Sequence, residues 1–202
     1  MAVIAIVPPR GFVIARPRLI DWSKTLRPPM GGETQRLRRL GTRWGLSVQL
    51  PVIREGEVLA ALIADILAAR NEGASYPWPQ PGIIIGTAGA PAVNGAGQTG
   101  SAINLRGFAA GYGVRKGQYF SVTVSGRRYL YQFSAARVAD GGGFMAGAAI
   151  FPMLRRSPGD GAVLDLNPVI EGDITADNAD GFEWEHDFDD QVPLQFSIVE
   201  VA

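Results

Sequence analysis

Cysteine is absent from this chain of 202 residues, and His186 is its only histidine. Without thiols the chain can form neither a disulfide framework nor a thiolate metal site, and one histidine cannot supply a two-histidine metal motif. The sequence also lacks the G-x-S-x-G nucleophile elbow of many Ser-His-Asp hydrolases. We therefore expect no enzyme activity, no catalytic residue, no bound metal and no cofactor.

Long apolar runs are also missing. No stretch of eighteen or more apolar residues occurs, so the sequence predicts no membrane-spanning helix and no membrane insertion. Residues 1–10, MAVIAIVPPR, have no basic region ahead of the apolar stretch and no small-residue cleavage pattern behind it, so we expect no signal peptide. With 47% apolar residues, the chain is long enough to bury a core without covalent cross-links.

The chain has no formal net charge, but its charges are unevenly distributed. Residues 1–54 carry ten Lys or Arg against Asp21 and Glu33 alone, whereas residues 171–202 carry ten Asp or Glu and no Lys or Arg. The basic end could bind nucleic acid, the two ends could neutralise each other, or copies could stack basic surface to acidic surface. Two separately solvated surfaces are a further alternative.

Glycine and proline are scattered along the chain as turn signals, which favours many short strands. We expect a turn over residues 41–43 between two strands that each bury one face, and a β-hairpin turning at Ser125-Gly126. Residues 76–81 read as a linker or edge segment because their prolines interrupt regular structure. The predicted strands cover residues 34–40, 44–50, 83–85, 101–108, 120–124, 128–133, 144–151, 162–166, 168–174 and 194–201.

One amphipathic helix is predicted, from Arg54 to Asn71, with Gly73 in position to cap its end. Its apolar stripe is formed by Leu59, Leu62, Ile63, Ile66 and Leu67. A single stripe indicates that the helix packs one face on a sheet. We therefore expect a mainly β fold, sandwich-like or barrel-like, that carries one helix.

Gly95, Gly97 and Gly100 have the G-x-G-x-x-G spacing of a dinucleotide-binding loop. That loop needs a strand ending at the first glycine and a helix beginning at the third. Here the strand candidate at residues 83–85 ends too early, and residues 101–108 read as a strand interrupted by Gly107. The spacing is therefore interpreted as a set of tight turns rather than a nucleotide site.

The acidic run Glu183-Trp-Glu185-His186-Asp187-Phe-Asp189-Asp190 would place alternate carboxylates on one face of a strand. A calcium site or a glycosidase pair would use such carboxylates, but the run lacks the glycine of a calcium loop. A solvated or partner-facing acidic edge is the favoured interpretation, because charge runs are usually exposed.

Two other groups of residues allow a binding function. Arg36, Arg38 and Arg39 could contact phosphates, although the chain lacks a recognisable nucleic-acid module and no specific nucleic-acid partner is expected. Large aromatic residues could line a sugar site, although singly spaced ones are more often core or interface anchors. They are Trp22, Trp44, Trp78 and Trp184.

The order of several segments resembles that of distal tail (baseplate) proteins of long-tailed bacteriophages, over about residues 30–202. The segments are ETQRLRRLGTRW (33–44), VNGAGQTGSAINLRGF (93–108), KGQYF with YLY (116–131), FPMLRRSP (151–158) and FSIVE (196–200), together with the amphipathic helix. Each motif alone is moderately specific, and their shared order carries the resemblance.

The resemblance implies a structural virion component at the tail tip, assembled in the host bacterial cytoplasm. It implies a ring of copies of the chain, commonly six, that joins the tail tube to the hub and continues the DNA channel. Its partners would be other copies, the tail tube protein, and baseplate hub or tail fibre proteins. A carbohydrate-binding host-recognition module of the tail tip is the alternative.

On this interpretation residues 1–202 form one unit, in which residues 1–90 make a strand-and-helix, ring-forming part and residues 91–202 a β-rich part. We also expect the regions 36–43 and 183–190 to lie at subunit or partner contacts, because complementary charge on the two surfaces of a head-to-tail ring aids assembly.

Overall fold

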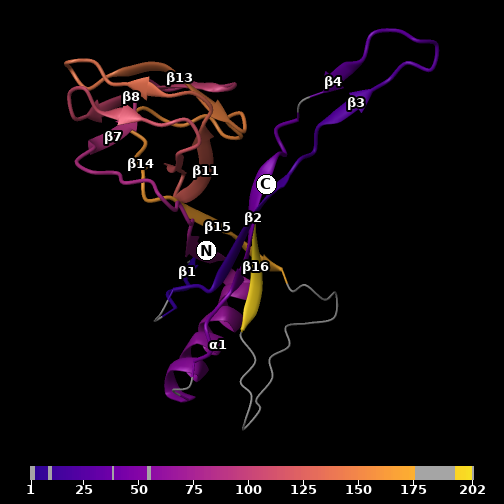
Figure 1. Cartoon of the computed structure of the whole chain (residues 1–202), viewed down its shortest axis with the longest axis vertical. Helices are drawn as coiled ribbons and strands as arrows, with labels where there is room; N and C mark the ends of the chain where they lie inside the picture. The colour runs from indigo at the N-terminus through magenta and orange to yellow at the C-terminus, as the bar shows by residue number, and fades with distance from the viewer. Residues whose placement is uncertain (1–2, 9–10, 38, 54–55, 176–193, 202) are drawn as a thin grey trace.

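The computed structural model describes residues 3–8, 11–37, 39–53, 56–175 and 194–201, and within them the chain is mainly β with one helix packed on a sheet (Figure 1). This confirms the predicted fold class. The helix α1 spans Gly56–Glu72. The strands are β1 (Ile4–Ala5), β2 (Ile14–Ile20), β3 (Lys24–Leu26), β4 (Gln35–Leu37), β5 (Arg43–Gln49), β6 (Ala74–Pro77), β7 (Gly89–Val93), β8 (Ala102–Phe108), β9 (Gly113–Val114), β10 (Tyr119–Val124), β11 (Arg127–Phe133), β12 (Arg137–Val138), β13 (Met145–Phe151), β14 (Leu164–Asp165), β15 (Val169–Thr175) and β16 (Gln195–Glu200).

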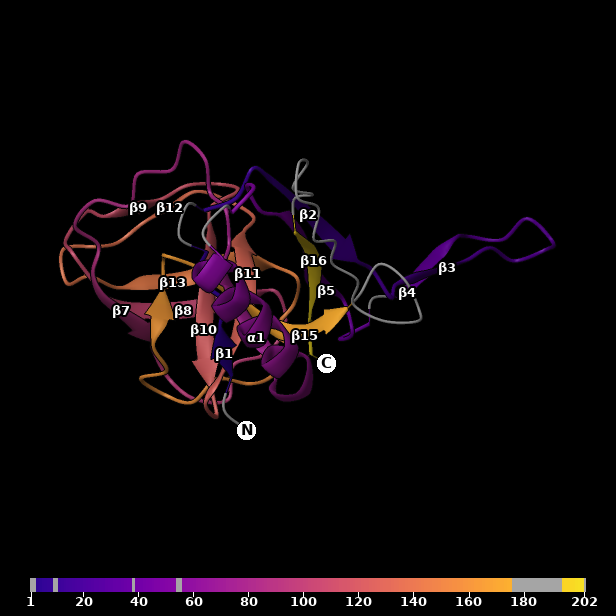
Figure 2. The ribbon, with the colours of Figure 1, turned by 90° about the horizontal axis from the view of Figure 1, so that it is seen from below.

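The first sheet draws its six strands from both ends of the chain, in the order β1-β6-β15-β16-β5-β2. Strands β15 and β16 return from the C-terminal end to pair with β6 and β5. The first sheet therefore combines strands from residues 1–90 with strands from residues 91–202. Helix α1 packs against β1, β6 and β15 and covers part of one face of this sheet (Figure 2).

Helix α1 buries Leu62, Ile63, Ile66 and Ala69, and Ile66 is 1% exposed. Leu67 was predicted on the buried stripe but is 40% exposed, because the sheet contacts the side of the helix that carries Ala69 instead. The end of the helix agrees with the prediction. Gly73 has φ +96° and its amide donates to the carbonyl of Ala69 at 2.8 Å, as in a left-handed cap.

The second sheet has the order β14-β10-β11-β13-β8-β7 and curves into a nearly closed barrel. Its two end strands approach each other through a bridge between Ala92 and Val163 and a 2.9 Å hydrogen bond from Val93 N to Ala162 O. Fully buried side chains fill the interior, including Phe120 and Phe133, whose rings stack 4.3 Å apart. The barrel interior is therefore a packed core.

The hairpin predicted around Ser125-Gly126 is confirmed as β10 and β11. Both turn residues have positive φ, +52° and +78°, as a two-residue type I′ turn requires. Strand β11 is buried on both faces, because Leu130 belongs to the core of the first sheet and Tyr131 to that of the barrel. The hairpin therefore lies between the two cores.

The predicted hairpin of residues 34–40 and 44–50 is wrong. Residues 43–49 do form a strand with one buried face, but β5 pairs with β2 and β16 rather than with residues 34–40. Thr42 and Arg43 are not in a turn, since the turn falls at residues 40–41 and Arg43 begins β5. The N-terminal strand β2, which was not predicted, takes the expected position beside β5.

Two shorter predicted segments also differ in the structure. Residues 83–85 lie in a loop, not a strand, and Ile84 is 85% exposed. Tyr76 and Pro77 were assigned to a linker or edge, but they end β6, and the amide of Trp78 donates to the carbonyl of Pro168 at 2.8 Å. Proline is tolerated here because the partner strand β1 is only two residues long and leaves Pro77 without a neighbour on that side.

A buried ion pair joins the two sheets. Glu200, which is 1% exposed, accepts hydrogen bonds from Trp44 N on β5 at 2.8 Å, from Leu130 N on β11 at 2.8 Å and from Arg155 Nη2 at 2.6 Å. Burial raises the pKa of the Glu200 carboxyl, and these three donors oppose that shift by stabilising the carboxylate. The guanidinium also lies 5.0 Å from the centre of the Tyr129 ring.

We predict that Arg155→Ala lowers the free energy of unfolding by about 3–5 kcal/mol, because it leaves the Glu200 carboxylate buried without its cation. Arg156→Ala, which removes the exposed neighbouring arginine, is the control and should change stability by no more than about 0.5 kcal/mol. Chemical denaturation measures both values. A loss below about 1 kcal/mol for Arg155→Ala would show that the pair does not hold the sheets together.

Candidate functional site

The most distinctive surface of the molecule is an arm, residues 21–41, that projects from the end of the first sheet (Figure 1, upper right). It carries strands β3 and β4, and both views show it extending clear of the body (Figure 2). All six residues of β3 and β4 are exposed. In the part of the chain that the structure describes, the arm thus has its surface free for contact with other molecules.

The arm is the outer end of one long hairpin that begins inside the sheet. Strands β2 and β5 pair from Ile14↔Gln49 to Ile20↔Arg43, and the ladder resumes with Lys24↔Leu37. Three residues separate the two ladders on the outgoing strand and five on the returning strand, so the register shifts by two. This irregularity marks where the arm leaves the body.

Asp21 holds the base of the arm together. Its carboxylate accepts hydrogen bonds from Ser23 N at 2.9 Å, Ser23 Oγ at 2.6 Å and Thr42 Oγ1 at 2.9 Å. The hydrogen bonds from Ser23, then that from Thr42, lower the pKa of Asp21 below its ordinary value. At neutral pH the carboxylate is therefore ionised and ties the outgoing strand to the returning strand.

A proline-glycine turn forms the tip of the arm. Gly31 has φ +79°, and its amide donates to the carbonyl of Pro28 at 3.3 Å. Met30 lies within this turn and is 95% exposed. A large thioether side chain at such a position suits contact with an apolar surface of another protein, since methionine adapts its shape to its neighbours.

Exposed apolar side chains are concentrated in the N-terminal part of the chain. Of the eighteen large apolar residues exposed among the described residues, ten lie between Val7 and Leu40. Five of these are in the arm: Trp22, Leu26, Met30, Leu37 and Leu40. Single exposed apolar residues are ordinary, but this concentration on a projecting element indicates an interaction surface.

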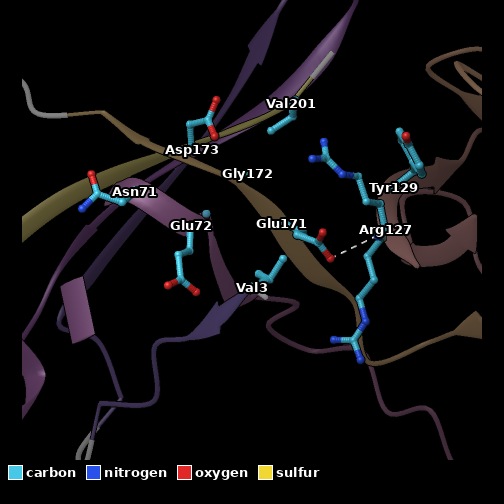
Figure 3. Close-up of a pocket in the computed structure, with 11 residues that line it drawn as sticks. Val3, Asn71, Glu72, Arg127, Tyr129, Glu171, Gly172, Asp173 and Val201 are labelled. Atoms are coloured by element: carbon cyan, nitrogen blue, oxygen red, sulfur yellow. Dashed lines mark hydrogen bonds between the residues drawn. The ribbon is translucent and has the colours of Figure 1, made fainter. Parts of the chain in front are cut away.

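A small cavity lies where the end of α1, strand β15 and the start of β11 meet (Figure 3). Its volume is about 90 Å³. Its lining includes the carboxylates of Glu72, Glu171 and Asp173 and the side chains of Arg127 and Arg128, and the Arg128 amide donates to Glu171 at 3.1 Å. Pockets for metabolites or drug-sized ligands usually measure about 300–1,000 Å³, so this cavity is too small for such a ligand.

The glycine motif is the loop of a hairpin, which confirms its interpretation as a turn. Gly95, Gly97 and Gly100 all have positive φ and connect β7 to β8, so a strand and not a helix follows the third glycine. The Gln98 side chain closes the loop by donating to the carbonyls of Asn94 and Gly95, each at 2.9 Å. No helix N-terminus is present in this loop to hold a phosphate.

The tryptophans in the described residues divide between core and arm. Trp44 and Trp78 are buried, 5.7 Å apart between ring centres, and both pack against Tyr119. They are core anchors rather than a platform for sugars. Trp22, at the base of the arm, is 52% exposed and covers Gly41, where an added Cβ would stand 3.4 Å from the ring.

Of the remaining candidate residues from the sequence, some lie within the described residues and others lie outside them. Arg36 and Arg39 are exposed on the arm, as expected for a contact surface. The acidic run 183–190, with His186 and Trp184, and also Arg38, lie outside the described residues. Among the described residues no group of three or more His, Cys, Asp or Glu side chains could hold a metal ion, and no helix is long and apolar enough to cross a membrane.

Sequence reasoning missed the contribution of residues 21–33 to this surface. The signal was available in Pro28-Pro29 and Gly31-Gly32, which are turn dipeptides with a short alternating segment on each side, KTL and QRL. Placing a turn there pairs residues 24–26 with 35–37, as observed.

No protein-family model matches the chain, and no curated protein sequence matches it either.

We predict that Asp21→Ala increases the rate of tryptic cleavage at Lys24, Arg36 or Arg39 several-fold without changing the melting temperature, because Asp21 joins only the two strands at the base of the arm. Asp65→Ala, an exposed carboxylate on α1, is the matched control and should leave the cleavage rate unchanged. Mass spectrometry of the fragments measures the rates. Equal rates for Asp21→Ala and the wild type would show that Asp21 does not anchor the arm.

Proposed function

We propose that this protein is a structural component of a bacteriophage tail tip, where copies of the chain form a ring that joins the tail tube to the hub and continues the DNA channel. The observation that carries the proposal is the projecting arm, with its exposed apolar residues, on a body that is otherwise well packed. The resemblance of the ordered segments to distal tail proteins supplies the type of assembly.

The arm has little to stabilise it within its own chain. It has three residue pairs in β3 and β4, and all of these residues are exposed. An isolated two-stranded hairpin is marginally stable in water, so a neighbouring molecule that covers one face of the arm would stabilise it. A head-to-tail contact of this kind generates a ring when the rotation between neighbours closes.

Neither the barrel interior nor the cavity beside α1 favours a ligand-binding function in the described residues. The barrel is filled by its own side chains, and the cavity of about 90 Å³ in the described region is too small for a metabolite. The carbohydrate-binding alternative depended on exposed tryptophans. Trp44 and Trp78 are in the core, Trp22 is 52% exposed on the arm, and Trp184 lies outside the described residues. An assembly function therefore accounts best for the surface of the chain.

We predict that the wild-type chain forms a closed oligomer, alone or with tail tube subunits, and that the triple variant Leu26→Ser, Met30→Ser, Leu37→Ser remains a folded monomer. The three substitutions remove apolar contact area from the arm without touching the core. Sedimentation velocity and negative-stain microscopy measure the assembly.

The matched control replaces three apolar residues of similar exposure on the body, by Ile84→Ser, Val138→Ser and Val163→Ser, and should assemble as the wild type does. A wild-type chain that stays monomeric in the presence of tube subunits, or that converts a small molecule, would contradict the proposal. Glycan binding by the monomer would favour the host-recognition alternative.

A further inference from the structure

The arm combines positive charge with apolar side chains. Residues 21–40 contain five Lys or Arg and two acidic residues, a net charge of +3. Arg36 is 68% exposed and has only a 3.6 Å contact with Asp21. In the part of the chain that the structure describes, no carboxylate lies within ion-pair distance of Lys24, Arg27 or Arg39. These cations are therefore available to pair with carboxylates of a partner.

The register of the arm shows how these groups are arranged. Lys24 lies opposite Leu37, and Leu26 lies opposite Gln35. Residues that are directly opposite in an antiparallel pair, and residues two apart on one strand, share a face. One face of the arm thus presents two leucines with Lys24 beside them, and the other face presents Arg36. A complementary partner would carry carboxylates interleaved with large apolar residues.

One segment of this same chain has that composition. The acidic segment, residues 176–193 (ADNADGFEWEHDFDDQVP), contains seven Asp or Glu and no Lys or Arg. Phe182, Trp184 and Phe188 are interleaved with its carboxylates. Opposite charges can pair with the arm while aromatic rings contact the leucines and the arginine planes.

The topology favours a second copy of the chain as the source of this segment. It joins β15 to β16, and β16 begins beside the end of β5 that is farthest from the arm, since Gln195 pairs with Gln49 and Leu50 N donates to Leu194 O. The arm leaves from the other end of β5, at Arg43. Figure 1 shows β16 running along the sheet between these two ends.

Chain length sets how far the segment can extend. At roughly 3.3 Å per residue, the seven residues of β5 separate the two ends of the sheet by about 20 Å. The arm continues outward from that end of the sheet (Figure 1), and at the same rise the ten residues from Ile20 to Met30 add about 30 Å. A segment of eighteen residues that is fixed at both ends extends at most about 30 Å from them. It falls well short of the tip of its own arm.

We infer that the arm of one copy binds the acidic segment of a second copy, so that this contact repeats from subunit to subunit. The inference rests on the proposed ring and names the two surfaces that meet in it. Because each copy has one arm and one acidic segment, the contact is head-to-tail, as a closing ring requires. Ionic pairing also makes the contact weaken as salt rises.

The test is a charge-reversal cycle measured by sedimentation at low salt. Reversing the arm (Lys24→Glu, Arg27→Glu, Arg39→Glu) or the acidic segment (Glu185→Lys, Asp187→Lys, Asp189→Lys) should each weaken assembly by roughly tenfold or more. Combining both sets should restore it. The control reverses Arg115, Lys116 and Arg156, exposed cations outside the arm, and should assemble normally.

Cysteine cross-linking gives an independent measurement, because the natural chain has no cysteine to compete. A mixture of Arg27→Cys copies and Asp187→Cys copies should form a disulfide-linked dimer on mild oxidation, and a mixture of Arg156→Cys and Asp187→Cys copies should not. Each single variant should also keep the wild-type melting temperature, which excludes misfolding as the cause.

The outcomes separate this inference from the proposed function. A wild-type ring that is insensitive to both reversals and gives no cross-link would overturn the inference and leave the ring in place. A wild-type chain that never assembles would contradict both. If the arm reversal abolishes retention of double-stranded DNA while the reversal of the acidic segment leaves assembly unchanged, the cations of the arm contact nucleic acid and the inference is wrong.

Discussion

The buried carboxylate of Glu200 connects the two sheets of this structure. It accepts hydrogen bonds from the backbone of β5 in the first sheet and of β11 in the barrel, and it pairs with Arg155. The β5 donor is Trp44, the residue next to Arg43, where the arm leaves the sheet. The group that joins the two sheets therefore also holds β5 in place one residue from the start of the arm.

A well-packed junction and an exposed arm are consistent with the proposed function, in which copies of the chain assemble through the arm. Trp44, Trp78 and Tyr119 pack together behind the arm's strand and stabilise the junction through aromatic contacts. Beyond Arg43 such support ends, and the exposed leucines and Met30 are available to another molecule. In the proposed ring, the buried ion pair holds β5 next to the base of the arm, and the exposed apolar residues of the arm are the surface proposed to contact the neighbour.

The sequence predicts the parts of the fold that depend on local pattern. The Ser125-Gly126 turn, the cap at Gly73 and the fold class follow from turn chemistry and periodicity, and the structure confirms them. Strand pairing is set by contacts distant in sequence, so the partner of residues 44–50 was assigned wrongly. The Glu200 pair was likewise missed, because a carboxylate in the last strand has no local signature. Because the arm has no hydrophobic core, only the residues of its turn mark it in the sequence.

The account depends on an arm that a neighbouring copy stabilises. Amide hydrogen exchange of residues 24–37, measured in the isolated subunit and in the assembled ring, tests this most directly. We expect rapid exchange in the subunit and strong protection in the ring, while the amides of β5 and β16 stay protected in both states, because their hydrogen bonds are internal to the first sheet. Arm amides that exchange at the same rate in both states would contradict the account.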